Sequence, residues 1–263
     1  MEMNRIYFFT GTGNSLKVAK DIANALGDCE IVAIYKGTDM KIPIGYRRIG
    51  FVFPVYYFGL PDMVANFIRQ AELTKENAEY YFAVATPGGF SGKPIVQMAR
   101  LLSEKDIHLD YGAKIRMNAN YIVSYGSIGL YYVTAMKSYN KHIGKIIHDI
   151  KNTTTAEIEK YSKYYEKIYL DTICNVHNID DGYHASDACT SCGICTKVCP
   201  ANNITLQDGR PVFRHRCECC MACIQHCPNK ALNYQEKTQK RKRYTHPDIT
   251  YLEISKYYRQ PAT

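Results

Sequence analysis

The chain has 263 residues, a formal net charge of +8 at pH 7 and a hydrophobic share of 46%. This length allows two domains of unequal size, and the composition excludes a chain too polar to build a hydrophobic core. The first residues show no basic stretch followed by an apolar run, so the sequence predicts a cytoplasmic protein without a secretory signal.

Residues 5–9 form a short apolar run that predicts a first strand, and a loop of small residues follows at 10–15. Apolar residues at helical spacing then predict a helix over 16–26 that ends at Gly27. A loop between a strand and a helix start presents backbone N–H groups and the positive end of the helix dipole to a phosphate. Four loop side chains add short hydrogen-bonding groups: Thr10, Thr12, Asn14 and Ser15.

This loop lacks the features of two common nucleotide-binding loops. A P-loop requires a Lys immediately before its Ser, where this chain has Asn14. A dinucleotide fingerprint requires a third Gly three positions after Gly13, where the chain has Leu16. The loop instead resembles the phosphate loop of flavodoxins, Thr/Ser-x-Thr-Gly-x-Thr/Ser, at every position from Thr10 to Ser15.

Three further strands are predicted at 30–34, 48–53 and 80–86, and helices are predicted at 62–70 and 93–104. Strands that alternate with helices indicate an α/β fold, a doubly wound parallel sheet with helices on both faces. Ligands of such sheets bind beyond the carboxyl ends of the strands. We therefore expect the loops after the first, third and fourth strands to converge at one edge.

The flavodoxin resemblance implies that FMN binds at this edge, with its ring between the loops after the third and fourth strands. Aromatic side chains at 56–58 would stack on the ring, and Gly88 and Gly89 would let the backbone approach its polar edge. Taken singly, each aromatic residue is equally compatible with core packing. The implied FMN-binding residues are Thr10, Gly11, Thr12, Gly13, Asn14, Ser15, Pro54, Val55, Tyr56, Tyr57, Phe58, Gly59, Thr86, Pro87, Gly88, Gly89 and Phe90.

After Lys114 the chain departs from a plain flavodoxin. A fifth strand is expected at 113–117, but residues 118–136 form an extra segment without a charged side chain. Its length could span a bilayer, whereas its Asn, Ser, Gly and Tyr residues favour a buried loop or strand that covers the flavin or docks a second domain. The other expectations here are helices at 135–151 and 156–170, an N-cap at 153–155 and surface positions for His142 and His148.

Residues 189–228 repeat one cysteine pattern, C-x-x-C-x-x-C-x-x-x-C-P, twice. In this spacing three cysteines wrap one cluster and the fourth, which precedes the Pro, ligates the other cluster. We therefore predict two [4Fe–4S] clusters with crossed ligation. The first would be held by Cys189, Cys192, Cys195 and Cys227, and the second by Cys217, Cys220, Cys223 and Cys199.

Two alternatives fit this cysteine pattern less well. Structural zinc uses four ligands with a longer gap between pairs, and disulfides require an oxidising compartment. We interpret Cys219 as a non-ligand because its use would disturb the spacing, and Cys29 and Cys174 show no pairing logic. The stretch closely resembles bacterial two-cluster ferredoxins, which pack short strands such as those expected at 204–206 and 211–213 beside the clusters.

A basic run near the C-terminus places five positive charges within residues 237–243. Such a run can bind nucleic acid or an acidic redox partner, but it is most often a solvated face. Without a nucleic-acid-binding fold, we expect no nucleic-acid partner.

The predicted organisation has three parts. A flavodoxin-like domain covers 1–175 and includes an extra segment at about 118–170. A small α+β ferredoxin-like domain at 176–235 follows a polar linker at 171–185, and a basic tail at 236–263 contains a short helix at 251–258.

Together the two halves resemble the flavodoxin–ferredoxin fusion proteins of anaerobic bacteria, the EFR-type ferrodoxin family. The resemblance implies electron transfer between two [4Fe–4S] clusters and FMN, with a redox protein or a small molecule as electron donor or acceptor. The alternative is an FMN-dependent reductase of a small organic substrate, with Tyr56, Tyr57 or a tyrosine of 121–132 as proton donor. The sequence favours the first function but leaves enzymatic activity, substrate and oligomeric state open.

Overall fold

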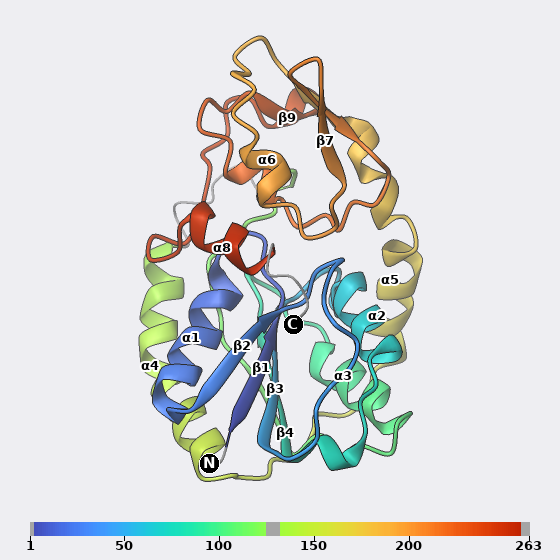
Figure 1. Ribbon diagram of the computed structural model, residues 1–263, viewed down its shortest axis with the longest axis vertical. Coiled ribbons are helices and arrows are strands. Elements are labelled where there is room, and N and C mark those ends of the chain that lie inside the picture. Colours follow the sequence, from blue (N-terminus) through green and yellow to red (C-terminus); the bar gives the residue numbers. More distant parts are fainter. Residues whose placement is uncertain (1–2, 125–131, 259–263) are drawn as a thin grey trace.

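The computed structural model describes residues 3–124 and 132–258 (Figure 1). Its larger part is a five-stranded parallel sheet in the order β2-β1-β3-β4-β5. This order is the flavodoxin-like form of the doubly wound sheet, so the expected α/β fold is confirmed. The strands are β1 (Asn4–Phe8), β2 (Cys29–Ala33), β3 (Tyr46–Pro54), β4 (Ala78–Thr86) and β5 (Tyr111–Lys114).

The central strands β3 and β4 are buried along most of their length because helices cover both faces of the sheet (Figure 1). Their sequences are nearly continuous apolar runs for the same reason. One close fit between them requires a glycine. A Cβ on Gly50 would lie 2.0 Å from the ring of Phe82, its register partner.

Each face of the sheet has its own helices and its own hydrophobic cluster. Ile22 and Ile146 pack on one face with Phe8, while Phe67 and Met98 pack on the other. The apolar positions of each helix therefore face the sheet, as the sequence periodicity predicts. The helices of the first face are α1 (Asn14–Leu26) and α4 (Tyr132–Lys151); those of the second are α2 (Asp62–Gln70) and α3 (Pro94–Ser103), with the short 3₁₀ turn η1 (Lys75–Asn77) before β4.

The helix expected at 156–170 begins later than predicted. Residues 153–162, including the threonines expected to cap that helix, follow a non-helical path, and α5 (Lys163–Ile173) comes after them. The Ala156 N–H donates to the carbonyl of the residue before β5, at 2.9 Å, and the Glu159 carboxylate forms ion pairs with two lysines. These contacts hold the segment along the sheet edge and override its local helical pattern.

A second, smaller body follows α5 and carries both cysteine motifs. Its strands form two antiparallel pairs, β6 with β9 and β7 with β8, and the second pair confirms the expected strand–turn–strand. Its elements are the 3₁₀ helix η3 (Val176–Gly182), β6 (Tyr183–Ala185), α6 (Ile194–Lys197), β7 (Ile204–Gln207), β8 (Arg210–Phe213), α7 (Ala222–Gln225), β9 (Leu232–Tyr234) and the 3₁₀ turn η4 (Gln235–Lys237).

The linker predicted at 171–185 is wrong, because this stretch runs through the end of α5, η3 and β6 without an unstructured spacer. Its polar residues serve the small body instead. The buried Asp180 carboxylate accepts hydrogen bonds from Asn203 Nδ2 at 2.7 Å and from the His215 backbone N–H at 3.2 Å. A polar composition therefore marks buried hydrogen bonds here rather than a flexible connection.

The small body sits over the carboxyl ends of the parallel strands, and the chain then returns to the sheet as α8 (Tyr251–Tyr257) beside α1 (Figure 1). Ile254 joins the hydrophobic cluster of α1 and α4, so the expected short final helix is confirmed. His142 and His148 are exposed on α4, as predicted. No helix within the described residues is long and apolar enough to cross a membrane.

The basic run divides into two kinds of side chain. Lys237, Lys240 and Lys242 are exposed, as expected for a solvated face. The two arginines are partly buried and hold neighbouring backbone. Arg241 Nη1 donates to the Val123 carbonyl at 2.8 Å, and Arg243 Nη2 donates to the Leu232 carbonyl at 3.0 Å.

Candidate cofactor sites

The loop between β1 and α1 is suited to receive an anion. Gly13 precedes α1 with a φ of 96°, a conformation that favours glycine, and donates its N–H to Thr10 Oγ1 at 3.1 Å. The first amides of α1 have no acceptor within the helix, and its first turn contains no acidic residue. Thr12 and Ser15 are almost fully buried. Backbone donors at a helix start with no competing carboxylate suit a phosphate group.

Hydrogen bonds draw the three strand ends together. Ser15 Oγ lies 2.8 Å from Thr86 Oγ1, and the Thr86 hydroxyl donates to the Phe53 carbonyl at 3.3 Å. Residues from all three loops therefore line one cavity at the carboxyl ends of the strands. The sequence-predicted residues that line it are Thr10, Gly11, Thr12, Asn14, Ser15, Pro54, Val55, Tyr56, Tyr57, Phe58, Thr86, Gly88, Gly89 and Phe90.

The loop after β3 turns tightly at its aromatic residues. Tyr57 and Phe58 have positive φ angles of 48° and 70°, which are unusual for bulky side chains. Tyr56 and Gly59 close the turn with reciprocal backbone hydrogen bonds of 3.0 and 2.8 Å. Backbone strain of this kind is often retained at functional sites, and here it shapes one wall of the cavity.

Three predicted residues, Gly13, Gly59 and Pro87, are not among the described residues that line the cavity. Gly13 and Gly59 shape the turns just described. The Pro87 carbonyl accepts the Met117 N–H at 2.9 Å, which holds the loop after β4 against the chain that follows β5. A Cβ on Gly88 would lie 2.7 Å from Ala119 Cα in the same region.

Six further residues line the cavity. Tyr121 was predicted only as one of the candidate proton donors at 121–132, and the other five were not predicted as site residues: Asn118, Ala119, Asn120, Ser124 and Cys219. Most of them belong to the uncharged segment at 118–136, so the lack of charge was the available signal for a cavity wall. Asn118 is 2% exposed, and neither polar atom of its side chain has a partner among the described residues. Of the tyrosines considered as proton donors, Tyr125 and Tyr131 lie outside the described residues.

The cysteines gather around two separate cavities. Each cavity receives three cysteines of one motif and the last cysteine of the other, as crossed ligation requires. The first is lined by Cys189, Cys192, Cys195 and Cys227. The second is lined by Cys199, Cys217, Cys220 and Cys223. Four thiols per cavity are the donor set of a [4Fe–4S] cluster, so these residues fit that group.

Burial makes several of these thiols, most of them in the second cavity, poor acids in the absence of a cation. It raises the pKa of Cys217 and Cys223 well above the usual value and that of Cys195 to about 11. A thiolate at such a position needs a metal ion to compensate its charge. The burial of the thiols in the second cavity therefore favours a bound metal over free thiolates there.

The second cysteine motif packs directly on the phosphate loop. A Cβ on Gly11 would lie 2.2 Å from the Cys220 carbonyl oxygen, so only glycine allows this approach. His226 Nε2 lies 3.3 Å from the Gly11 carbonyl oxygen. Burial lowers the pKa of His226 to about 4, which keeps the ring neutral. Asn120 Nδ2 adds a hydrogen bond of 3.1 Å to Thr12 Oγ1.

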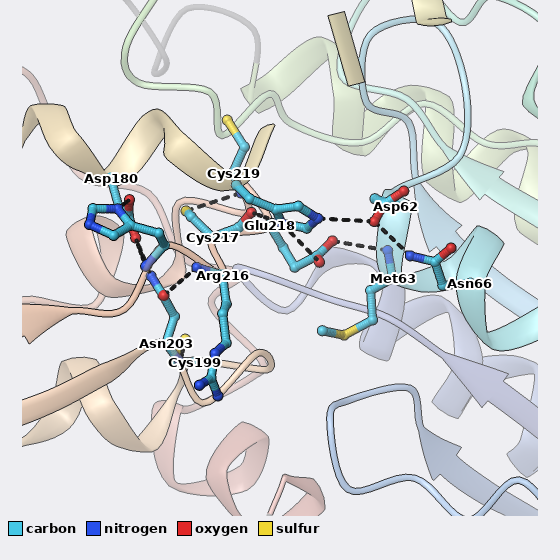
Figure 2. A network of polar contacts seen from close by, with 12 residues as sticks. Asp62, Met63, Asn66, Asp180, Cys199, Asn203, Arg216, Cys217, Glu218 and Cys219 are labelled. Carbon is cyan, nitrogen blue, oxygen red and sulfur yellow. Dashed lines mark hydrogen bonds and ion pairs between the residues drawn. The ribbon is translucent and has the colours of Figure 1, made fainter. Parts of the chain in front are cut away.

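A polar network joins α2 to the same motif (Figure 2). Glu218 Oε2 accepts the Met63 N–H at 3.0 Å, and His177 lies 3.3 Å from Asp62 Oδ2 and 3.0 Å from the Cys217 carbonyl oxygen. Burial raises the pKa of the Glu218 carboxyl to about 8, despite the hydrogen bond from Met63. These contacts fix the second cysteine motif against the sheet domain.

Comparison with known protein families assigns most of the small body to one family. The family described as the 4Fe-4S dicluster domain matches residues 188–232. A search among curated proteins found no match.

Among solved structures, the chain is similar to the Fusobacterium nucleatum flavodoxin bound to flavin mononucleotide, with 16% identity, 59% of this chain and 100% of that chain covered, and a TM-score of 0.41. Megasphaera elsdenii flavodoxin in its two-electron reduced state has 21% identity, with 43% and 85% covered and a TM-score of 0.36. The FMN-dependent NADH-azoreductase of Bacillus anthracis in complex with FMN has 9% identity, with 57% and 100% covered and a TM-score of 0.41.

The strand order defines a flavodoxin-like sheet domain, and the family match assigns a 4Fe-4S dicluster domain to residues 188–232. The chain is thus a fusion of these two domains, with the sheet first in sequence and the dicluster domain after it.

Proposed function

We propose that the protein transfers electrons between two [4Fe–4S] clusters and FMN. The carrying observation is that one short stretch, 217–220, borders two cavities. Cys217 and Cys220 line the second cysteine cavity, whereas Cys219 lines the cavity at the strand ends. Two redox groups bound in these cavities would be separated by a single loop of the chain.

FMN fits the cavity at the strand ends because its lining matches the parts of that molecule. The loop at 10–15 would hold the phosphate through backbone N–H groups and hydroxyls, where charge-assisted hydrogen bonds are strong. Tyr56 and Tyr57 would flank the flat ring, and the unpartnered Asn118 side chain offers one donor and one acceptor to its polar edge.

The cysteines would hold the clusters in the crossed arrangement that the two cavities support. The first cluster would take Cys189, Cys192, Cys195 and Cys227, and the second Cys199, Cys217, Cys220 and Cys223. Bound clusters exchange single electrons and FMN accepts one or two, so their combination allows single electrons to be collected or an electron pair to be divided. The chain itself positions the groups and limits the access of water.

A second candidate function is an FMN-dependent reduction of a small organic substrate. The observation in its favour is that Tyr57 and Tyr121 line the same cavity. Burial raises the pKa of Tyr121 to about 12, which keeps its hydroxyl protonated and able to act as a proton donor at neutral pH. A Tyr121→Phe variant that keeps full turnover with every acceptor would leave electron transfer as the supported function.

The test of the proposed function is anaerobic reconstitution followed by analysis of composition and turnover. We expect about eight iron and eight acid-labile sulfide per chain together with FMN, and reduction of an acceptor only when both cofactor types are present. Iron, sulfide and flavin contents are measured first, and then reductant-to-acceptor turnover before and after FMN removal. Stoichiometric zinc without sulfide, or turnover unchanged by FMN removal, would refute the proposal.

A further inference from the structure

Cys219 faces a different cavity from the cysteines on either side of it. Its φ of 52° lies in the left-handed region, and its N–H donates to Cys217 Sγ at 3.3 Å. This local turn directs the Cys219 side chain to the cavity at the strand ends, while Cys217 and Cys220 line the second cysteine cavity. Through Cys219, the iron–sulfur domain therefore contributes a side chain to the cavity at the strand ends.

The thiol has a defined position in that cavity. Cys219 Sγ lies 3.2 Å from the Tyr57 hydroxyl, and Cys219 is 4% exposed. The rings of Tyr57 and Tyr121 meet edge to face, with their centroids 6.4 Å apart. Side chains from three distant stretches of sequence therefore form one wall of mixed aromatic and sulfur surface, which suits a flat, polarisable ring.

An independent observation indicates a ligand in this cavity. Asn118 is 2% exposed and lines the cavity, yet neither its Oδ1 nor its Nδ2 has a partner among the described residues. A buried carboxamide without partners is costly, so its donor and acceptor indicate a ligand that carries the complementary pair. The edge of a flavin ring has adjacent N–H and carbonyl groups of this kind.

The spare cysteines elsewhere offer no comparable arrangement. Cys29 lies at the start of β2, and Cys174 is exposed after α5. Neither is among the described residues that line the cavity. They therefore serve as internal controls for Cys219.

We propose that Cys219, although not a cluster ligand, is a flavin-contacting residue that the iron–sulfur domain supplies to the FMN site. With Tyr57 it forms the wall of that site nearest the second cluster, so the FMN site is complete only when both parts of the chain are folded together. This inference rests on the proposed function, because it takes FMN as the occupant of the cavity.

Thiol protection tests the inference without using turnover. The Cys29→Ser/Cys174→Ser chain, with its clusters intact by iron and sulfide analysis, leaves Cys219 as the only cysteine that is not a proposed ligand. It is treated anaerobically with methyl methanethiosulfonate, with and without FMN, and modified peptides are quantified. With FMN at ten times its Kd, competition should slow the modification of Cys219 about tenfold. Inorganic phosphate, which occupies only the loop at 10–15, should give no protection. Equal modification with and without bound FMN would overturn the inference.

If the buried Cys219 thiol proves unreactive, the FMN affinity of a Cys219 variant tests the same inference. Cys219→Phe places a phenyl ring in the cavity. Because this ring would overlap the space proposed for the flavin, the substitution should raise the Kd for FMN at least about tenfold. The control Cys174→Phe, at an exposed cysteine that does not line the cavity, should bind FMN within about twofold of wild type. Both should retain wild-type iron and sulfide. Unchanged FMN affinity in Cys219→Phe would overturn the inference, whereas failure of the wild-type chain to bind FMN would refute the proposed function itself.

Discussion

At the scale of single residues, glycine decides how closely the iron–sulfur domain approaches the phosphate loop. A Cβ on Gly11 would lie 2.2 Å from the Cys220 carbonyl oxygen. A Cβ on Gly13 would lie 2.8 Å from Ile249 Cβ in the C-terminal segment. The loop is therefore enclosed from two sides by distant parts of the chain. Its residues serve both the anion site and the packing of the two domains.

Gly11→Ala should weaken FMN binding and disturb the second cluster together, because the new Cβ would lie 2.2 Å from the Cys220 carbonyl oxygen. Overpacking of this kind costs about 1–3 kcal/mol. Flavin fluorescence quenching and iron analysis measure the two effects. The control is Gly144→Ala on α4, where open space should allow a stabilisation of about 0.5–1 kcal/mol. Wild-type FMN affinity and iron content in Gly11→Ala would contradict this packing.

Crossed ligation predicts an unusual result for paired cysteine substitutions. Cys199 and Cys217 come from different motifs but line the same cavity. The double variant Cys199→Ser/Cys217→Ser should therefore lose one cluster and keep about four iron per chain. Cys195→Ser/Cys199→Ser, from a single motif, should lose both clusters. Iron and sulfide analysis after anaerobic reconstitution measures this, and the reverse pattern would show uncrossed ligation.

At the scale of elements, two extended segments complete the sheet domain. The segment before α8 covers the phosphate loop, where the His246 N–H donates to the Thr12 carbonyl at 2.8 Å. At the other end of α8, the Tyr258 hydroxyl donates to the Thr10 carbonyl at 2.5 Å. The segment at 153–162 covers the edge at β5. Neither segment has enough internal hydrogen bonding to be stable alone, so each is held by tertiary contacts.

Glu159→Gln tests the second of these segments. Burial alone would raise the pKa of Glu159, but Lys114 and Lys93 outweigh it and hold that pKa below its usual value. A lowered pKa means that the ion pairs stabilise the fold at neutral pH and are lost only as the pH falls below the ordinary glutamate range. The variant should lose about 1 kcal/mol of unfolding free energy at pH 7, and less in high salt. Anaerobic urea unfolding followed by circular dichroism measures the loss. The exposed Glu157→Gln should lose none, and equal stability of the two variants would argue against the ion pairs.

At the scale of the whole molecule, the two bodies are joined at the carboxyl ends of the strands, where their proposed cofactor sites meet. Contacts from Gly11, Glu218 and Asn120 link the sheet domain to the second cysteine motif. The first cysteine cavity lies elsewhere in the small body, and its Cys192 is exposed. If the proposed cofactors are bound, this arrangement would favour entry or exit of electrons at the first cluster and exchange with FMN at the second.

Thr12→Asp should remove FMN while leaving the proposed clusters in place. A carboxylate at the almost fully buried Thr12 would repel the phosphate and should abolish FMN binding. The proposed cluster ligands begin at Cys189, so iron and sulfide should stay at wild-type levels while turnover through flavin stops. Thr12→Asn, with the same shape and no charge, should retain measurable FMN affinity. Equal loss in both variants would indicate that steric disruption, rather than charge, removes the flavin.

The sequence by itself determined the features that depend on local spacing. The cysteine repeat, the loop from Thr10 to Ser15 and the alternation of strands with helices are short-range patterns, because ligand geometry, helix starts and hydrophobic periodicity act over a few residues. Only the tertiary structure decided the rest. Residues 156–162 follow their contacts with the sheet edge rather than their own helical pattern, and the polar stretch at 171–185 supplies buried hydrogen bonds. Cys219 and Asn118 reach one cavity from positions about a hundred residues apart, and such an encounter depends on packing, which no local pattern records.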